Sequence, residues 1–115
     1  MQRPFDEEEL LARFDDRELL VESVSLLREE WEKFLPILER AFAEGDRHTA
    51  EWAAHQLKGS LSHFAAPGPV EICRKLERWA ASGEGSEVEA NMEDLKLEVA
   101  EVLGALDSFV WEDGS

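Results

Sequence analysis

Apolar residues recur every three or four positions along almost the whole chain, and no stretch alternates between apolar and polar residues as a half-buried strand would. This spacing predicts a protein of the all-α class. The predicted helices are a short one over residues 7–13, a long one ending before Gly45, one around His55, one over 70–81 and one from Val88 to Val110. Such amphipathic helices with short links predict an antiparallel four-helix bundle with a short additional N-terminal helix.

Helix caps and prolines mark the boundaries of these elements. Asp46 is positioned to cap the helix that carries His55, and that helix is expected to stop at the Pro-Gly-Pro run of residues 67–69. Pro36 lies inside the long helix and is expected to kink it or divide it near Phe34.

Toward the C-terminus, residues 82–85 are predicted to form a turn, and Ser86 with Glu89 matches a capping box. The bundle is expected to cover about residues 15–111, with a frayed tail over 112–115. The last helix also has the alternating four-three spacing of a coiled coil, but about three heptads are marginal for a dimer. Since the same residues are needed to close the bundle, a monomer is favoured.

The helix around His55 sets that histidine opposite its own apolar side. At about 100° per residue, six apolar residues point within roughly 60° of one direction: Ala50, Ala53, Ala54, Leu57, Leu61 and Phe64. His55 lies about 160° from the core direction on the same geometry, so we expect its imidazole to be exposed. Gly59 and Ser62 share its side of the helix, and Lys58 borders it.

Gly59 stands in the middle of this helix, where no cap is needed. Glycine there costs about 1 kcal/mol relative to alanine, which suggests that something must approach the backbone closely beside His55. Lys58 brings an ammonium group within reach of any anion carried by the imidazole. A solvated surface histidine is the commoner interpretation of a lone His, but it does not explain the glycine.

The run His55-Gln56-Leu57-Lys58-Gly59-Ser60 is followed by Cys73 and by Leu76-Glu77, and it is preceded by Ala41-Phe42-Ala43-Glu44-Gly45-Asp46. These residues resemble the histidine-containing phosphotransfer (HPt) domain of phosphorelays, and the resemblance spans about Phe14 to Val110. One position differs from the family pattern. The family usually has a second glycine ten residues after the histidine, where this chain has Ala65, so a modest change at the helix end is expected.

The resemblance implies a phosphocarrier and not an enzyme. His55 would accept a phosphoryl group from a receiver-domain aspartate and pass it to the aspartate of another receiver, since imidazole has a free nitrogen lone pair near neutral pH. Lys58 would stabilise the phosphoryl charge, and Gly59 would clear space for the partner. The implied partners are response-regulator receiver domains and a hybrid sensor kinase. The receiver would supply Mg²⁺, and no cofactor of its own is expected for this chain.

Trp52 lies beside His55 and Gly59 and is a natural anchor for a partner, together with Ser62 and His63. The alternative is that the N-terminal segment covers Trp52 with Phe5 or Leu10. The remaining tryptophans are predicted core residues: Trp31, Trp79 and Trp111.

Three further interpretations concern the helix that carries His55. Glu51, one turn before His55, is a candidate to orient the imidazole by accepting a hydrogen bond from its non-reacting nitrogen. Glu51 and His55 would form only a weak two-ligand metal site, because His48 and His63 lie too far along the helix to share the ion, so no metal site is expected. A degenerate HPt scaffold that only binds partners would be expected to lack His55 or Lys58, yet both are present.

Composition narrows the classes of partner and compartment. The 115 residues suit one domain covering 1–115, and a hydrophobic content of 43% argues against disorder. The net charge of −15 disfavours nucleic acid and anionic membranes as partners. The single cysteine, Cys73, excludes an internal disulfide and is predicted to be a buried core residue. The acidic N-terminus is unlike a signal peptide, so a cytoplasmic location is expected.

Overall fold

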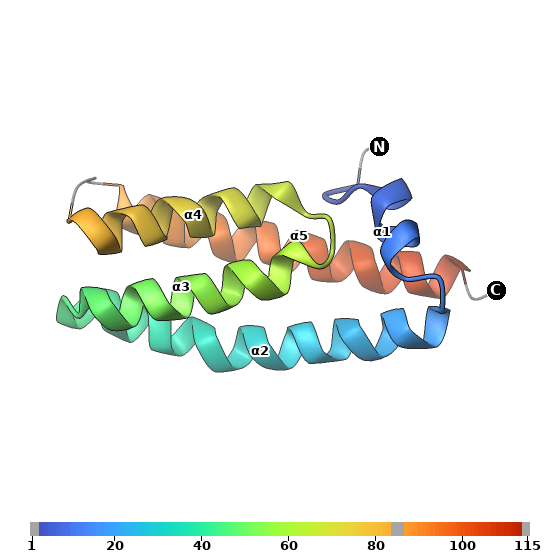
Figure 1. Ribbon diagram of the computed structural model, residues 1–115, viewed down its shortest axis with the longest axis horizontal. Coiled ribbons are helices and arrows are strands. Elements are labelled where there is room, and N and C mark those ends of the chain that lie inside the picture. Colours follow the sequence, from blue (N-terminus) through green and yellow to red (C-terminus); the bar gives the residue numbers. More distant parts are fainter. Residues whose placement is uncertain (1–2, 84–86, 114–115) are drawn as a thin grey trace.

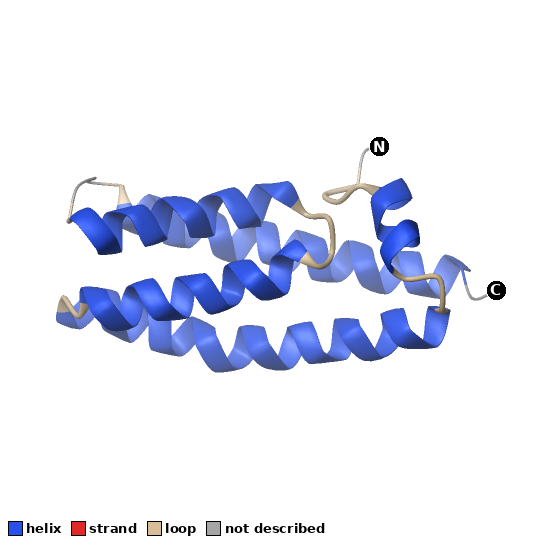
Figure 2. Ribbon diagram, viewed as in Figure 1, coloured by secondary structure: helices blue, strands red, loops and turns tan. Residues whose placement is uncertain are grey.

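The computed structural model describes residues 3–83 and 87–113, and within these ranges it contains five helices and no strand. They are α1 (Glu7–Arg13), α2 (Arg17–Glu44), α3 (Arg47–Ser62), α4 (Pro67–Ser82) and α5 (Val88–Asp113). The four long helices lie side by side in alternating directions, and α1 lies at the end of the bundle where α2 begins (Figures 1 and 2). Helix α3 packs against α2 and α4, and α5 closes the ring against the same two helices. The predicted fold class is confirmed.

The apolar side of each helix faces a single core. All six apolar residues predicted for the inner side of α3 and its C-terminal end are buried, and none is more than 3% exposed. Trp31 and Trp79 are partly buried and pack against this core, whereas the side chain of Trp111 lies outside those described. None of the described helices is long and apolar enough to cross a membrane.

The residues at the helix ends satisfy backbone groups that have no hydrogen-bond partner within the helix. The Asp46 carboxylate accepts hydrogen bonds from the backbone N–H and the hydroxyl of Thr49 at the start of α3, and these bonds lower the pKa of Asp46. Gly45 ends α2 with a φ of +70°, a conformation that glycine adopts without steric cost. The predicted start of the α3 helix is therefore confirmed.

The prolines do not break the chain as predicted: Pro36 does not divide its helix, and residues 67–69 form no link between helices. Helix α2 continues undivided through Pro36, which is exposed and stands between the buried side chains of Phe34 and Leu38. Core packing on both sides holds the helix together although Pro36 donates no backbone hydrogen bond. The Pro-Gly-Pro run of residues 67–69 is not a link but the first turn of α4, where a missing N–H has no helical acceptor to lose.

The C-terminal boundaries are partly corrected. Helix α4 includes Ser82, which was predicted to be the first residue of the turn. The helix is capped by Gly83, whose φ is +74°, so the chain leaves the helix one residue later than predicted. Ser86, and with it the predicted capping box, lies outside the described residues. Helix α5 starts at Val88 as predicted and continues to Asp113, beyond the predicted start of a frayed tail.

The N-terminal segment closes one end of the bundle. The Asp6 N–H donates to the Ala65 carbonyl at 2.9 Å, the Phe14 ring stacks on Phe64 at 5.5 Å, and the Phe5 ring meets Phe109 edge-on at 5.7 Å. Ala65 has a φ of +54°, the left-handed conformation that favours glycine. Ala65 therefore holds a backbone conformation that glycine would adopt with less steric cost.

Candidate functional site

His55 projects from the outer side of α3, in the middle of the helix. Burial of Ala54 and Leu57 fixes the rotation of α3 about its axis, so the imidazole points away from the core with 65% of its side chain exposed. Gly59 and Ser62, one and two turns further on, are also exposed. The structure therefore places these three residues together on one surface, as the helical spacing predicts.

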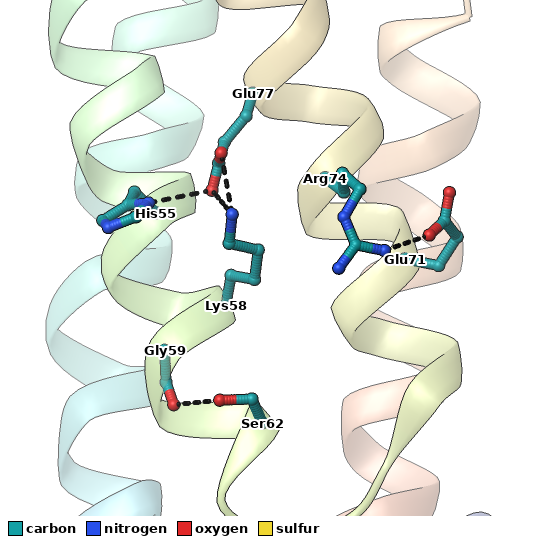
Figure 3. Close-up of polar contacts among 7 residues, drawn as sticks. All are labelled: His55, Lys58, Gly59, Ser62, Glu71, Arg74 and Glu77. Atoms are coloured by element: carbon teal, nitrogen blue, oxygen red, sulfur yellow. Dashed lines mark hydrogen bonds and ion pairs between the residues drawn. The ribbon is translucent and has the colours of Figure 1, made fainter.

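A carboxylate from the neighbouring helix joins His55 to Lys58. Oε1 of Glu77, on α4, lies 3.3 Å from Nδ1 of His55 and 3.0 Å from Nζ of Lys58. Lys58 also donates a 3.0 Å hydrogen bond to Oε2 of the same carboxylate. Figure 3 shows the Glu77 side chain reaching across from α4 to lie between the histidine and the lysine of α3. The site is thus a polar cluster that spans two helices.

The sequence motif includes Glu77 but predicts no role for it, and Glu51 is the residue expected to orient the imidazole. In the structure the carboxylate at Nδ1 comes from Glu77, and no polar contact between Glu51 and His55 is found among the described residues. The signal available in the sequence was the position of Glu77 directly after the core residue Leu76 and one turn after Cys73. That position puts a carboxylate at the edge of the core, facing α3.

The surroundings of Glu77 favour a proton or a cation beside it. Its side chain is only 19% exposed, and Oε1 is covered from solvent without accepting a hydrogen bond of good geometry. A shielded carboxylate oxygen attracts positive charge more strongly than an exposed one. It therefore favours the imidazole tautomer whose proton is on Nδ1, which leaves the lone pair on Nε2. Figure 3 shows the second ring nitrogen on the far side of the ring from Glu77.

Cys73 lies one turn before Glu77 on α4 and is fully buried. Burial, followed by the negative charge of Glu77, raises the pKa of the thiol to about 12. The thiol therefore stays protonated at neutral pH and is no nucleophile. The prediction that Cys73 is a core residue is confirmed.

Gly59 has open space around it. A methyl group built on its Cα meets nothing within 4 Å outside the local helix backbone. Its carbonyl accepts a 2.8 Å hydrogen bond from the Ser62 hydroxyl, which an alanine would also allow. Nothing inside the described chain therefore requires a glycine at this position.

Trp52, one turn before His55, is 47% exposed and packs edge-on against Phe34 of α2, with ring centroids 5.3 Å apart. The alternative that the N-terminal segment covers Trp52 is wrong, because Phe5 and Leu10 are buried in the core cluster and that segment binds the C-terminal end of α3. Half of the indole surface beside His55 is therefore open to a partner.

A groove of about 550 Å³ runs along the α2 side of His55. One wall is formed by the α3 side, with Gly59 and His63 among its residues, and the other by α2, with Leu26 and Glu30. Ser62 does not line it. His63 directly follows the last residue of α3, so its side chain is offset from that of His55 along the groove.

The described residues contain no group of three or more His, Cys, Asp or Glu side chains that could hold a metal ion. Glu51 and His55 share one side of α3, while His48 lies in its first turn. The arrangement in the described part of the chain is thus built around an imidazole, an ammonium and one carboxylate.

Comparison with known protein families gives one match. The family model described as Hpt domain matches residues 22–107 of the 115, which includes all of α3 and α4 and the histidine, lysine and glutamate of the site. Searches of curated proteins and of solved structures returned no match. Because the family match covers well over half of the chain and includes the whole polar cluster, this chain belongs to the Hpt domain family, whose members serve in phosphorelay phosphotransfer.

Proposed function

We propose that this protein carries phosphoryl groups between receiver domains on Nε2 of His55. The observation that carries the proposal is the contact between Nδ1 and the Glu77 carboxylate at 3.3 Å, on an imidazole that is otherwise exposed. A carboxylate at Nδ1 holds the ring and keeps the lone pair on Nε2, the nitrogen that a partner can reach.

The proposed transfer is a displacement at phosphorus. The Nε2 lone pair of His55 forms a bond to the phosphorus of a receiver's aspartyl phosphate, and the bond between phosphorus and the aspartate oxygen breaks, releasing the carboxylate. Since Nδ1 keeps its proton, the ring gains a positive charge as the N–P bond forms. The Glu77 carboxylate stabilises that charge, and the reverse displacement delivers the group to a second aspartate.

Lys58 is proposed to balance the charge of the phosphoryl group. Its ammonium group is already held on the reactive side of α3 by two 3.0 Å contacts with Glu77, so little side-chain freedom is lost when it interacts with a bound phosphoryl group. Phosphoryl transfer depends mainly on positioning and charge neutralisation, which is what a fixed lysine and glutamate provide.

The other groups that transfer requires are proposed to come from the partner proteins. These are response-regulator receiver domains and the receiver domain of a hybrid sensor kinase, in the cytoplasm. They supply the aspartate and the Mg²⁺, while this chain supplies the histidine and needs no cofactor of its own. Trp52, Ser62 and His63 are proposed to contact the receiver, because all three are exposed on or next to the reactive side of α3.

The three histidines of the chain offer matched variants for the test. Wild type, His55→Gln, His48→Gln and His63→Gln are each incubated with phosphorylated receivers and Mg²⁺, and the acid-labile, alkali-stable label is measured. We expect His55→Gln to take up no label and His48→Gln to keep the wild-type capacity, while His63→Gln, which alters a proposed receiver contact, still accepts label. Equal labelling of His55→Gln and wild type would refute the proposal. A wild-type protein that binds receivers without accepting label would indicate a non-catalytic interaction module instead.

A further inference from the structure

Helix α5 packs against α2 and α4 with its inner side, and among the described helices none lies over its outer side. At about 100° per residue, Leu97, Gly104 and Ser108 point within roughly 40° of one direction. That direction is opposite the buried Leu95 and Val99. The Leu97 side chain is 66% exposed, more than any other large apolar side chain in the described residues. It leaves apolar surface for another molecule to cover.

A groove of about 590 Å³ lies next to this leucine, between α5 and the N-terminal segment. Ala100, Gly104 and Ser108 line it from α5, and Arg3 and Pro4 line it from the N-terminal segment. A methyl group built on Gly104 meets nothing within 4 Å, so the packing of the described chain does not require a glycine there. A side chain of another molecule can therefore come close to the α5 backbone in this groove.

The charged residues around the groove are acidic. Asp94 and Glu101, one turn before and one turn after Leu97, are exposed and form no ion pair within the described residues. The one basic residue of α5, Lys96, is turned toward α2, where it pairs with Glu39 at 2.8 Å. The outer side of α5 thus combines an exposed apolar side chain with unneutralised carboxylates, and its charge is complementary to a basic partner.

We infer that the outer side of α5 is a docking surface for a basic amphipathic helix of another protein, with Leu97 as its anchor. Apolar residues of the incoming helix cover Leu97 and enter the groove at Gly104, as in other complexes in which a helix lies in a groove. Lysine or arginine residues beside its apolar face meet Asp94 and Glu101. A second copy of this chain does not fit, because two α5 helices would bring like charges together.

This surface is separate from the one that carries His55. Within the described residues α5 packs against α2 and α4 and not against α3, so it lies diagonally across the bundle from the histidine (Figure 1). A helix bound to α5 therefore leaves the imidazole open. The docking surface does not depend on the proposed function, but it suits a phosphocarrier, since receivers that share His55 must each leave before the next one binds.

The test uses two synthetic helical peptides of about 18 residues, long enough to pass both Leu97 and the groove. Both have leucine and alanine on one face, and the flanking residues are lysine in one peptide and glutamate in the other. Binding to the full chain is measured by fluorescence anisotropy. We expect wild type to bind the lysine peptide and not the glutamate peptide, and Leu97→Glu to weaken that binding about tenfold or more. Attraction by charge alone predicts the reverse, because Leu97→Glu adds a negative charge.

Two matched variants test the position of the site. Leu26→Glu makes the same change at an exposed leucine of α2 and should leave peptide binding unchanged. Gly104→Gln fills the groove and should weaken binding about tenfold, while phosphoryl transfer stays normal. Gly59→Gln, the same change on α3, should leave peptide binding unchanged. Thermal melts show whether each variant keeps its fold.

Several results would overturn the inference. These are no binding of the lysine peptide by wild type, equal weakening by Leu26→Glu, or unchanged binding by both Leu97→Glu and Gly104→Gln. A wild-type dimer in sedimentation experiments that Leu97→Glu dissociates would assign the surface to a second copy instead. Failure of wild type to accept label from a receiver concerns the proposed function alone, because peptide binding is measured without phosphorylation.

Discussion

The side of the molecule around His55 and the outer side of α5 share more features than their different roles suggest. Each presents an exposed leucine, Leu26 or Leu97, and each presents a helical glycine, Gly59 or Gly104, with nothing within 4 Å of an added methyl group. Only the first side adds a histidine joined to a lysine by a carboxylate from the neighbouring helix. An exposed glycine or leucine is therefore uninformative by itself, and the combination with the polar cluster is what indicates a reactive site.

The two regions also differ in charge. Helix α5 contains eight acidic residues and one basic residue, whereas α3 and α4 together contain five basic residues and three acidic ones. The net charge of −15 is thus concentrated away from the two helices that build the site. An acidic, metal-binding pocket on a partner would be repelled by α5 and guided toward α3 and α4, more strongly at low salt.

The largest difference between the two glycines should appear with a bulky side chain. We expect Gly59→Gln to slow phosphoryl transfer about 100-fold, because its side chain occupies the space that the partner needs to reach His55. Gly104→Gln places the same side chain on α5 and should leave transfer unchanged. The transfer rates of both variants are measured with the same receiver by stopping the reaction at successive times. Normal transfer by Gly59→Gln would mean that the partner does not approach His55 from this side.

Two glutamates on α4 allow a second comparison. Glu77→Ala removes the carboxylate from Nδ1 and from Lys58, and we expect transfer to slow about tenfold, which corresponds to about 1.4 kcal/mol in the barrier. Glu71→Ala removes a carboxylate whose ion-pair partners among the described residues are the exposed Arg74 and Arg78, and it should change the rate less than twofold. The two variants are compared by their single-turnover rates of phosphoryl transfer. Similar rates for the two variants would show that contact with the imidazole has no role in transfer.

The smallest effects concern stability, where the two glycines should behave alike. Gly59→Ala and Gly104→Ala should each raise the free energy of unfolding by up to about 1 kcal/mol, since both positions are helical and open. Gly45→Ala should instead lower it by about 1 kcal/mol, because its φ of +70° disfavours any side chain. Urea unfolding measures all three. A loss of stability in Gly59→Ala alone would assign that glycine a structural role.

Helix α3 was predictable in detail because its own spacing determines which side is buried. Six apolar positions fix its rotation, and the exposure of His55 follows without knowledge of any other helix. The cap of α3 at Asp46 was predictable for a similar reason, since the Thr49 N–H and hydroxyl that it binds are three residues away.

Contacts between helices were not predictable in the same way. Glu77 reaches His55 only because α3 and α4 pack at one particular rotation and register, which depends on side chains of both helices. The contact of Trp52 with Phe34 on α2 has the same origin. The course of α2 through Pro36 also depends on packing, because the core contacts of Phe34 and Leu38 outweigh the lost hydrogen bond.

The most direct test of the account is the chemical identity of the phosphorylated residue. Wild-type protein is phosphorylated by a receiver, digested under alkaline conditions and analysed for the labelled peptide and the position of the phosphoryl group on the ring. The contact between Glu77 and Nδ1 predicts that the label is on residue 55, as the Nε2-phosphohistidine isomer. Label on His48 or His63, or the Nδ1 isomer at His55, would contradict the central claim.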